Sequence, residues 1–161
     1  MTWPPNVEAV RWWLREVRPH LPADFPAVSV VGRGGHEVFS GMPGLEVLGE
    51  VPEMATVMRE TRAVVVPLQH GGGTRLKVLE ALAWGRPVIS TTKGVEGLRV
   101  TDGEHVLVAD DGADFAQLVQ DAWRDDVLSE RLTKAGRALA SSYSWDVIGE
   151  QYAEGLLGES P

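Results

Sequence analysis

The sequence contains no cysteine among its 161 residues. This absence excludes disulfide bonds, cysteine-ligated metal sites and thiol nucleophiles, and it fits a reducing compartment such as the cytoplasm. The four histidines are scattered along the chain, with no HExxH motif and no close pair. Such spacing argues against a histidine metal site. The residues therefore give no reason to expect a bound metal.

Long apolar runs and an excess of basic charge are also lacking. No run approaches the roughly 20 residues of a membrane span, and Met1 to Asn6 lack the basic and apolar regions of a signal peptide. The 15 lysines and arginines stand against 23 acidic residues, for a net charge of -8. We therefore expect no membrane span and no binding to nucleic acid through overall charge.

What the chain does contain is typical of one soluble globular domain. Its hydrophobic residues make up 43% and its charged residues 24%, and its length falls within the usual range for a single domain. Short apolar runs alternate with helical patterns, which predicts an α/β fold with a mainly parallel sheet. Strands are expected at 27–31, 45–48, 63–66, 87–90 and 106–108. Helices are expected from Pro4-Pro5 onward, over 53–60, over about 74–84 and in the last third, about 112–157.

In such a sheet, ligands bind beyond the carboxyl ends of the strands. The candidate loops are therefore 32–35, 49–52, 67–74 and 91–97. The third carries the strongest signal, because Gly71, Gly72 and Gly73 come directly before an expected helix. Glycines let the backbone approach a ligand, and a helix start offers unpaired N–H groups, so this loop predicts an anion site. The first, Gly32-Arg33-Gly34-Gly35, is not a dinucleotide motif and no helix is expected after it.

Charged residues sharpen the prediction for the glycine loop. Arg75 and Lys77 fall in the expected first turn, where the helix dipole disfavours each cation by about 0.3–1 kcal/mol. Their presence makes sense if an anion lies between them; the alternative is that both are solvated surface groups. Replacing both cations should leave the fold intact or make it slightly more stable. Glu80 is either a local ion-pair partner of Lys77 or a ligand of sugar hydroxyls. His70 is the one histidine that we place near a ligand.

The segment from Gly71 to Leu98, GGGTRLKVLEALAWGRPVISTTKGVEGL, resembles the donor-binding half of GT-B glycosyltransferases. It is most similar to the retaining, nucleotide-sugar-dependent group 4 enzymes. Weaker similarities at Trp3 to Val7, at 31–34 and at 102–105 extend the resemblance over nearly the whole chain. The resemblance implies a Rossmann-like parallel sheet with helices on both faces, one half of a GT-B fold, over residues 1–161.

The resemblance also implies a function. The full enzyme would transfer a sugar, with retention, from a nucleoside-diphosphate sugar to a glycan or lipid-linked acceptor, in the cytoplasm or at the inner membrane face. Arg75 and Lys77 would be the catalytic cations that neutralise the leaving diphosphate, and Glu80 would hold the ribose hydroxyls. No metal is expected, because cations and helix N-termini take over its role. Backbone contacts with the donor are implied for Gly71, Gly72, Gly73 and Thr74 (diphosphate and sugar) and for Gly49, Glu50 and Val51 (base).

Two departures from the family pattern stand out. The first glutamate of the family's E-x7-E motif falls at Gly72, so the usual carboxylate near the donor sugar is absent. A GT-B enzyme also has two such domains, and the acceptor-binding N-terminal one is absent here. We expect that domain as a partner and expect this chain alone to be inactive. The rival interpretation is a stand-alone, non-catalytic α/β module that binds a nucleotide or assembles with a partner.

The order of strands raises a further question. In a doubly wound sheet of order 3-2-1-4-5-6 the first strand is central, yet no strand precedes the helix that begins at Pro4-Pro5. The runs at 27–31 and 63–66 should flank the resulting gap. Either these two strands pair directly, or a second copy or a partner fills the gap. We favour association, and hence a homo-oligomer, because open strand edges are templates for pairing.

Overall fold

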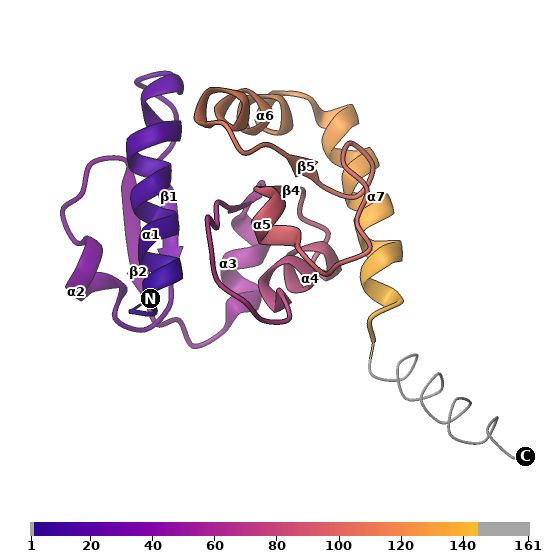
Figure 1. The fold of residues 1–161 in the computed structure, drawn as a ribbon, viewed down its shortest axis with the longest axis horizontal. Coiled ribbons are helices and arrows are strands. Elements are labelled where there is room, and N and C mark those ends of the chain that lie inside the picture. The colour runs from indigo at the N-terminus through magenta and orange to yellow at the C-terminus, as the bar shows by residue number, and fades with distance from the viewer. Residues whose placement is uncertain (1, 145–161) are drawn as a thin grey trace, which may run out of the picture.

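The computed structural model describes residues 2–144; the last expected helix, from Trp145 onward, lies outside them. Helices and strands alternate within this range, which confirms the α/β fold (Figure 1). The strands are β1 (Val28–Val31), β2 (Leu45–Gly49), β3 (Val64–Val66), β4 (Val88–Ser90) and β5 (Leu107–Val108). The helical segments are α1 (Pro4–Trp12), η1 (Trp13–Val17), η2 (Arg18–His20), α2 (Gly35–Phe39), α3 (Met54–Glu60), α4 (Leu76–Ala83), α5 (Thr92–Val95), α6 (Gly112–Arg124) and α7 (Asp126–Ser141).

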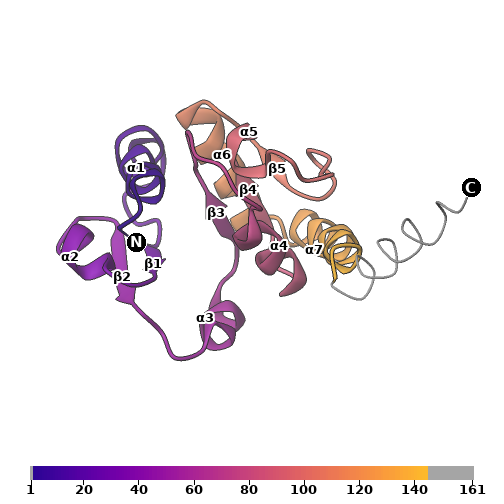
Figure 2. The same cartoon turned by 60° about the horizontal axis from the view of Figure 1, so that its bottom comes forward.

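The strands form two separate parallel sheets. β1 pairs with β2, and β3, β4 and β5 pair in that order. Helices α1 and α3 lie on opposite sides of the strands, as Figure 2 shows. Within residues 2–144, β1 and β3 do not pair with each other. The gap expected between these two strands is therefore present, and their direct pairing, one of the two alternatives, does not occur.

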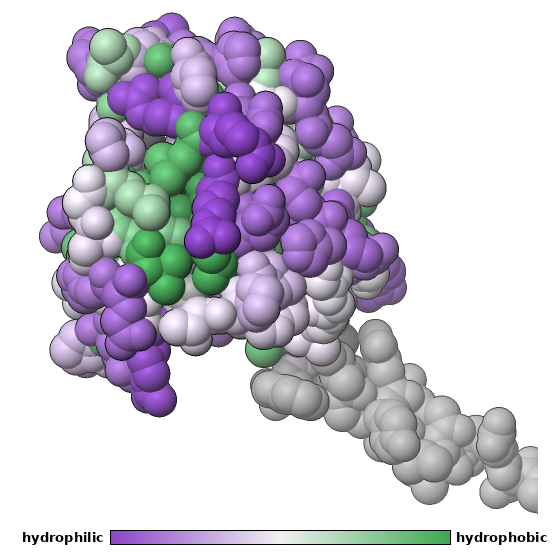
Figure 3. Space-filling view, turned by 60° about the vertical axis from the view of Figure 1, so that its left-hand side comes forward, coloured by the Kyte–Doolittle hydropathy of each residue, from purple (hydrophilic) through white to green (hydrophobic). Residues whose placement is uncertain are grey.

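A groove occupies this gap. Its volume is about 580 Å³, and residues Val28–Val31 of β1 and Val64–Val66 of β3 line its two sides. Val64 and Val65 are only half-buried, whereas all three residues of β4, which has a strand on each side, are buried. The partial exposure of Val64 and Val65 follows from the open edge of β3, which has a strand on one side only. Hydrophobic residues also form a patch on the side of the molecule that carries α1, β1 and β2 (Figure 3).

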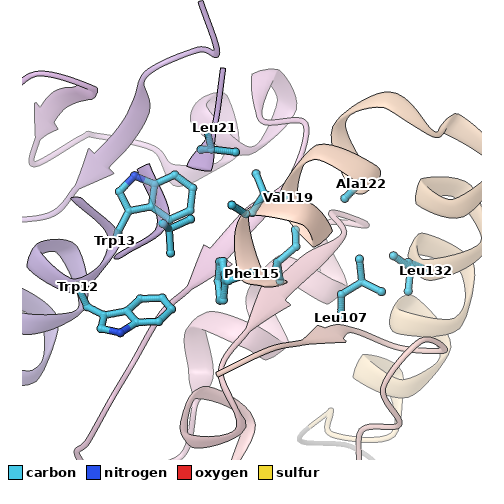
Figure 4. Packing of buried hydrophobic residues seen from close by; sticks show 11 residues of the cluster. Trp12, Trp13, Leu21, Leu107, Phe115, Val119, Ala122 and Leu132 are labelled. Carbon is cyan, nitrogen blue, oxygen red and sulfur yellow. The ribbon is translucent and has the colours of Figure 1, made fainter. Parts of the chain in front are cut away.

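The two sheets are held together by helices rather than by strand pairing. Phe115 of α6 is fully buried and makes edge-to-face contacts with Trp12 and Trp13, at centroid distances of 5.5 and 6.2 Å (Figure 4). Val119 and Ala122, on the same helical stripe, belong to this cluster, as the spacing in the sequence predicts. Apolar packing of α6 against α1 and η1 therefore bridges the gap.

Side-chain caps mark the starts of the two long helices α6 and α7. The side chain of Asp111 accepts hydrogen bonds from two amides of α6, and that of Asp125 accepts one from Leu128 of α7. One expectation is wrong: the loop 32–35 does lead into a helix, the five-residue α2. Its N-cap, Gly34, has φ +75°, a conformation that glycine adopts without strain.

Candidate functional site

The glycine loop after β3 presents an open stretch of backbone. Gly71 and Gly73 have φ values of +109° and +108°, which side-chain-bearing residues rarely adopt. A Cβ placed on Gly72 or Gly73 would meet no atom within 4 Å. The backbone here is therefore open to whatever binds in front of it. Thr74 follows and is also exposed.

Arg75 lies at the N-cap of α4, not in its first turn as the sequence predicts. It has φ +54°, the one positive φ among the non-glycine residues described, and only 6% of its surface is exposed. Its Nη2 donates to Gly71 O at 3.0 Å and to Glu96 Oε2 at 3.2 Å. Its Nε is buried with no acceptor among residues 2–144. Glu96 therefore pairs with the charge of Arg75, but one buried N–H donor of the guanidinium still has no acceptor.

Lys77 is the second cation at the start of α4. Its Nζ donates to Asn6 Oδ1 of α1 at 2.8 Å. The pKa of Lys77 lies below the ordinary lysine value, first because burial disfavours the charged ammonium group and second because of the positive charge of Arg75. The first backbone amide of α4 with a partner in the helix is that of Val78, which donates to Arg75 O. The amides of Leu76 and Lys77 come before it. Two cations and unpaired amides therefore meet at one helix end.

Glu80 lies one turn further along α4 and is exposed. Within residues 2–144 no ion pair joins it to Lys77, which bonds to Asn6 instead. The local ion-pair interpretation of Glu80 is therefore not supported by the contacts. Its carboxylate remains available on the exposed face of the helix.

The loop after β4 supplies a contact that the sequence analysis missed. Glu96 bonds to Lys93 Nζ at 2.6 Å and to Arg75, 21 residues away, at 3.2 Å. Lys93, through its hydrogen bond and its charge, and then Arg75 hold the pKa of Glu96 below its ordinary value. The loop 91–97 was among the candidates by its place after a strand, but nothing in its sequence points to the partner Arg75. Glu96 thus occupies the guanidinium that an external anion would use.

The carboxyl ends of β1 and β2 form the other part of the same edge. Arg33 makes two hydrogen bonds to the carboxylate of Glu50, at 3.1 and 3.2 Å. The ring of His36 lies over Gly49, where an added Cβ would come within 2.7 Å of it. Gly49 itself has φ +67°. The start of the loop from Gly49 to Val51 therefore depends on the positive φ of Gly49 and on the His36 ring packed against it.

The amino end of α1 connects these two parts. A Cβ on Gly34, after β1, would lie 2.5 Å from Thr2 Cγ2, and one on Gly71, after β3, would lie 3.1 Å from Trp3. The hydrogen bond from Lys77 to Asn6 is a further contact between the start of α4 and α1. The loops after β1 and β3 thus share one edge of the molecule. Asn6 is a further site residue to which no local pattern in the sequence points.

His70 is exposed and lies with Thr2 and Pro4 beside a small surface pocket. Among residues 2–144 no three histidine, aspartate or glutamate side chains are placed to hold a metal ion. In the same range no helix has both the length and the apolar character to cross a membrane.

Solved structures with this fold support the architecture. The crystal structure of Anabaena Alr3699/HepE in complex with UDP superposes with a TM-score of 0.70 at 16% identity, covering 98% of this chain and 45% of that one. The C-terminal domain of a glycosyl transferase group 1 family protein (LpcC) from Francisella tularensis superposes with a TM-score of 0.56 at 17% identity, covering 84% of this chain and 92% of that one. The GT-B fold expected from the sequence is confirmed.

Proteins with similar sequences point to the same family of enzymes. A phosphatidyl-myo-inositol mannosyltransferase of Mycobacterium leprae is 30% identical over 131 residues, 76% of this chain and 35% of that protein. The chain therefore spans about a third of the length of this curated relative. The family model for glycosyl transferases group 1 matches residues 1–125, a range that includes β1 to β5, the glycine loop and α4. Because this family model covers more than half of the chain, the chain belongs to the glycosyl transferases group 1 family.

Proposed function

We propose that this chain is the donor-binding domain of a GT-B glycosyltransferase. The full enzyme transfers a sugar, with retention, from a nucleoside-diphosphate sugar to a glycan or lipid-linked acceptor. The observation that carries the proposal is the buried guanidinium of Arg75, beside the open backbone of Gly72 and Gly73. The structures of HepE in complex with UDP and with UDP-glucose support the class of donor. The relative named a phosphatidyl-myo-inositol mannosyltransferase supports the class of acceptor.

In this proposal the diphosphate binds at the start of α4. The amides of the glycine loop and of Leu76 and Lys77 donate to its oxygens, and the helix dipole favours its charge. Arg75 turns from Glu96 toward the diphosphate, which satisfies the buried Nε. An anion beside Lys77 also favours its charged form, and its attraction opposes the two effects, burial and the charge of Arg75, that lower the pKa of Lys77. As the glycosidic bond breaks, these two cations stabilise the charge that develops on the leaving diphosphate, and no metal ion is required for that role.

The nucleoside extends away from this point along the same edge. The exposed carboxylate of Glu80 accepts hydrogen bonds from the two ribose hydroxyls. Because the side chain of Glu50 is held by Arg33, the base lies against the backbone of Gly49 to Val51 rather than against a free carboxylate. The acceptor and the rest of the catalytic machinery come from an N-terminal domain, so the isolated chain binds donor weakly and is inactive.

A thermal-shift panel tests the proposed function. Nucleoside diphosphates and nucleotide sugars are compared at millimolar concentration with the matching nucleosides and with inorganic phosphate. A ligand at 100 times its Kd stabilises the folded state by about 2.7 kcal/mol, so at least one diphosphate should raise Tm by several degrees while its nucleoside does not. No shift with any nucleotide contradicts the proposal and favours the non-catalytic assembly module.

The ribose contact gives a separate prediction. Replacing Glu80 with Gln should weaken binding of the nucleotide that the panel identifies by about 1.5–3 kcal/mol, because charge-assisted hydrogen bonds are lost. The 2′,3′-dideoxy form of the same nucleotide should lose much less affinity. Isothermal titration calorimetry on both ligands measures the difference, with Glu130→Gln, an exposed glutamate of α7, as the matched control. Equal weakening of both ligands means that Glu80 acts through the fold and not on the ribose.

A further inference from the structure

The loop after β4 is fixed against the end of β3, where the glycine loop begins. Gly94 of α5 lies so close to β3 that an added Cβ would be 2.7 Å from Val66 O. Thr91 is buried, and its hydroxyl donates to Leu68 O and accepts from Gly94 N–H at 3.1 Å. Helix α5 is therefore held at the carboxyl end of β3, and this sets the position of Glu96, the residue directly after it.

Glu96 is an exposed carboxylate that two cations hold in place. Its side chain is 56% exposed, and its Oε2 accepts from Lys93 Nζ at 2.6 Å and from Arg75 Nη2 at 3.2 Å. Its Oε1 bonds none of residues 2–144. A carboxylate that only pairs with an arginine commonly uses both of its oxygens on the guanidinium. Glu96 instead keeps one oxygen free as an acceptor while the other fixes its position.

This carboxylate keeps one of its two cations when a diphosphate takes Arg75. Lys93 is three residues before Glu96 on the same loop, and its bond to Glu96 does not involve Arg75. Lys93 first, and then Arg75, hold the pKa of Glu96 below its ordinary value, so the group is ionised near neutral pH. An ionised acceptor therefore stays beside the glycine loop after a diphosphate has bound.

The order of the strands places Glu96 on the side of the diphosphate opposite to the nucleoside. β1 and β3 line the two sides of the groove, β2 lies next to β1, and β4 lies next to β3. The loops after β2 and β4 are thus on opposite sides of the glycine loop. With the base against Gly49 to Val51, after β2, the other end of the diphosphate, which carries the sugar, points to the loop after β4. The glycines 71–73 offer no side chain there, whereas Glu96 offers a carboxylate.

We propose that Glu96 orients the donor sugar: its Oε1 accepts hydrogen bonds from sugar hydroxyls while Lys93 holds its Oε2. Glu96 is then a specificity-determining residue for the sugar, and Lys93 is the residue that positions it. The inference rests on the proposed donor site, because the diphosphate must bind Arg75 for the sugar to lie beside Glu96. A nucleoside diphosphate without a sugar makes no such contact, and for that ligand Glu96 is only a competitor for Arg75.

The experiment compares each nucleotide sugar with its own diphosphate. Calorimetric titration gives Kd for UDP, UDP-glucose, GDP and GDP-mannose with the unchanged chain and with Glu96→Gln. In the variant, Kd for a nucleotide sugar should rise about 10-fold or more relative to Kd for its diphosphate, because charge-assisted hydrogen bonds to the sugar are lost. The diphosphate itself should bind at least as tightly as before, since the competing carboxylate is gone.

Two further variants complete the design. Lys93→Met leaves the carboxylate in place but removes the ammonium group that holds it, so the ratio of the two Kd values should change in the same direction by a smaller factor. Glu130→Gln removes the same charge from the exposed surface of α7 and should leave the ratio as it is in the unchanged chain. Lys93→Met also serves as the second test if Glu96→Gln does not fold.

The ratio separates the inference from the proposed function. If Glu96→Gln weakens both members of a pair by the same factor, or changes neither, Glu96 does not contact the sugar and the inference is overturned, while the donor site stands. An equal change of the ratio in Glu130→Gln would assign the effect to overall charge and overturn it as well. If none of the four nucleotides binds the unchanged chain, the proposed function is contradicted, and the inference with it.

Discussion

Replacing Arg75 and Lys77 together with glutamine should weaken nucleoside diphosphate binding by about 100-fold or more. Each cation is expected to make charge-assisted hydrogen bonds to the diphosphate, at about 1.5–3 kcal/mol each, and 1.4 kcal/mol is a factor of ten in Kd. Calorimetric titration of the nucleotide identified by the panel measures the change. In a full-length enzyme that carries the same two substitutions, kcat should fall as well, because the cations act on a charge that develops in the transition state.

The matched control removes the same charge elsewhere. Arg15 and Lys134 are both exposed, on η1 and α7, so Arg15→Gln with Lys134→Gln lowers the net charge equally without touching the site. This variant should bind nucleotide as the unchanged chain does. Unchanged affinity in the variant of Arg75 and Lys77 would show that neither cation contacts the diphosphate. Equal loss in both variants would assign the effect to overall charge.

The same variant should also lower stability slightly, contrary to the expectation from the sequence. Arg75 is buried, and its removal takes a donor from Gly71 O and from Glu96. The expectation of higher stability assumes that Arg75 is a solvated cation in the first turn of the helix. Arg75 is instead buried and lies at the N-cap. Chemical denaturation of the variant gives the difference directly.

Truncating Phe115 should produce the largest loss of stability in the described part of the chain. The side chain is fully buried and touches both tryptophans at the junction of α1 and η1. Phe115→Ala leaves a cavity in the cluster that joins the two sheets, with an expected cost of about 3–5 kcal/mol. Urea unfolding followed by tryptophan fluorescence measures it, because Trp12 and Trp13 report on this packing.

A cost of this size can approach the whole stability of a single domain, which is about 5–15 kcal/mol. Phe115→Leu therefore serves as the second variant and should cost clearly less, since most of the volume remains. Val127→Ala, at a side chain that is 79% exposed, is the surface control and should change stability by no more than about 0.5 kcal/mol. If Phe115→Ala resembles that control, the packing of α6 against α1 and η1 does not hold the two sheets together.

Local patterns in the sequence were sufficient for the strands, for the longer helices and for the position of the gap, but not for the short helices α2 and α5. The apolar runs at 27–31 and 63–66 become β1 (Val28–Val31) and β3 (Val64–Val66), because side-chain periodicity depends only on neighbouring residues. The glycine loop before α4 was likewise readable, since positive φ values favour glycine wherever they occur. Chain order then placed the two runs on either side of a missing central strand.

Contacts between distant segments decided the rest. The bond from Lys77 to Asn6 spans 71 residues, and the ion pair from Arg75 to Glu96 spans 21. Neither has a local signal, because each depends on how α1 and the loop after β4 pack against the start of α4. The same holds for the open gap. The sequence left direct pairing of β1 and β3 open. The tertiary structure decides the question, because it packs Trp12 and Trp13 on Phe115 across a gap in which β1 and β3 do not pair.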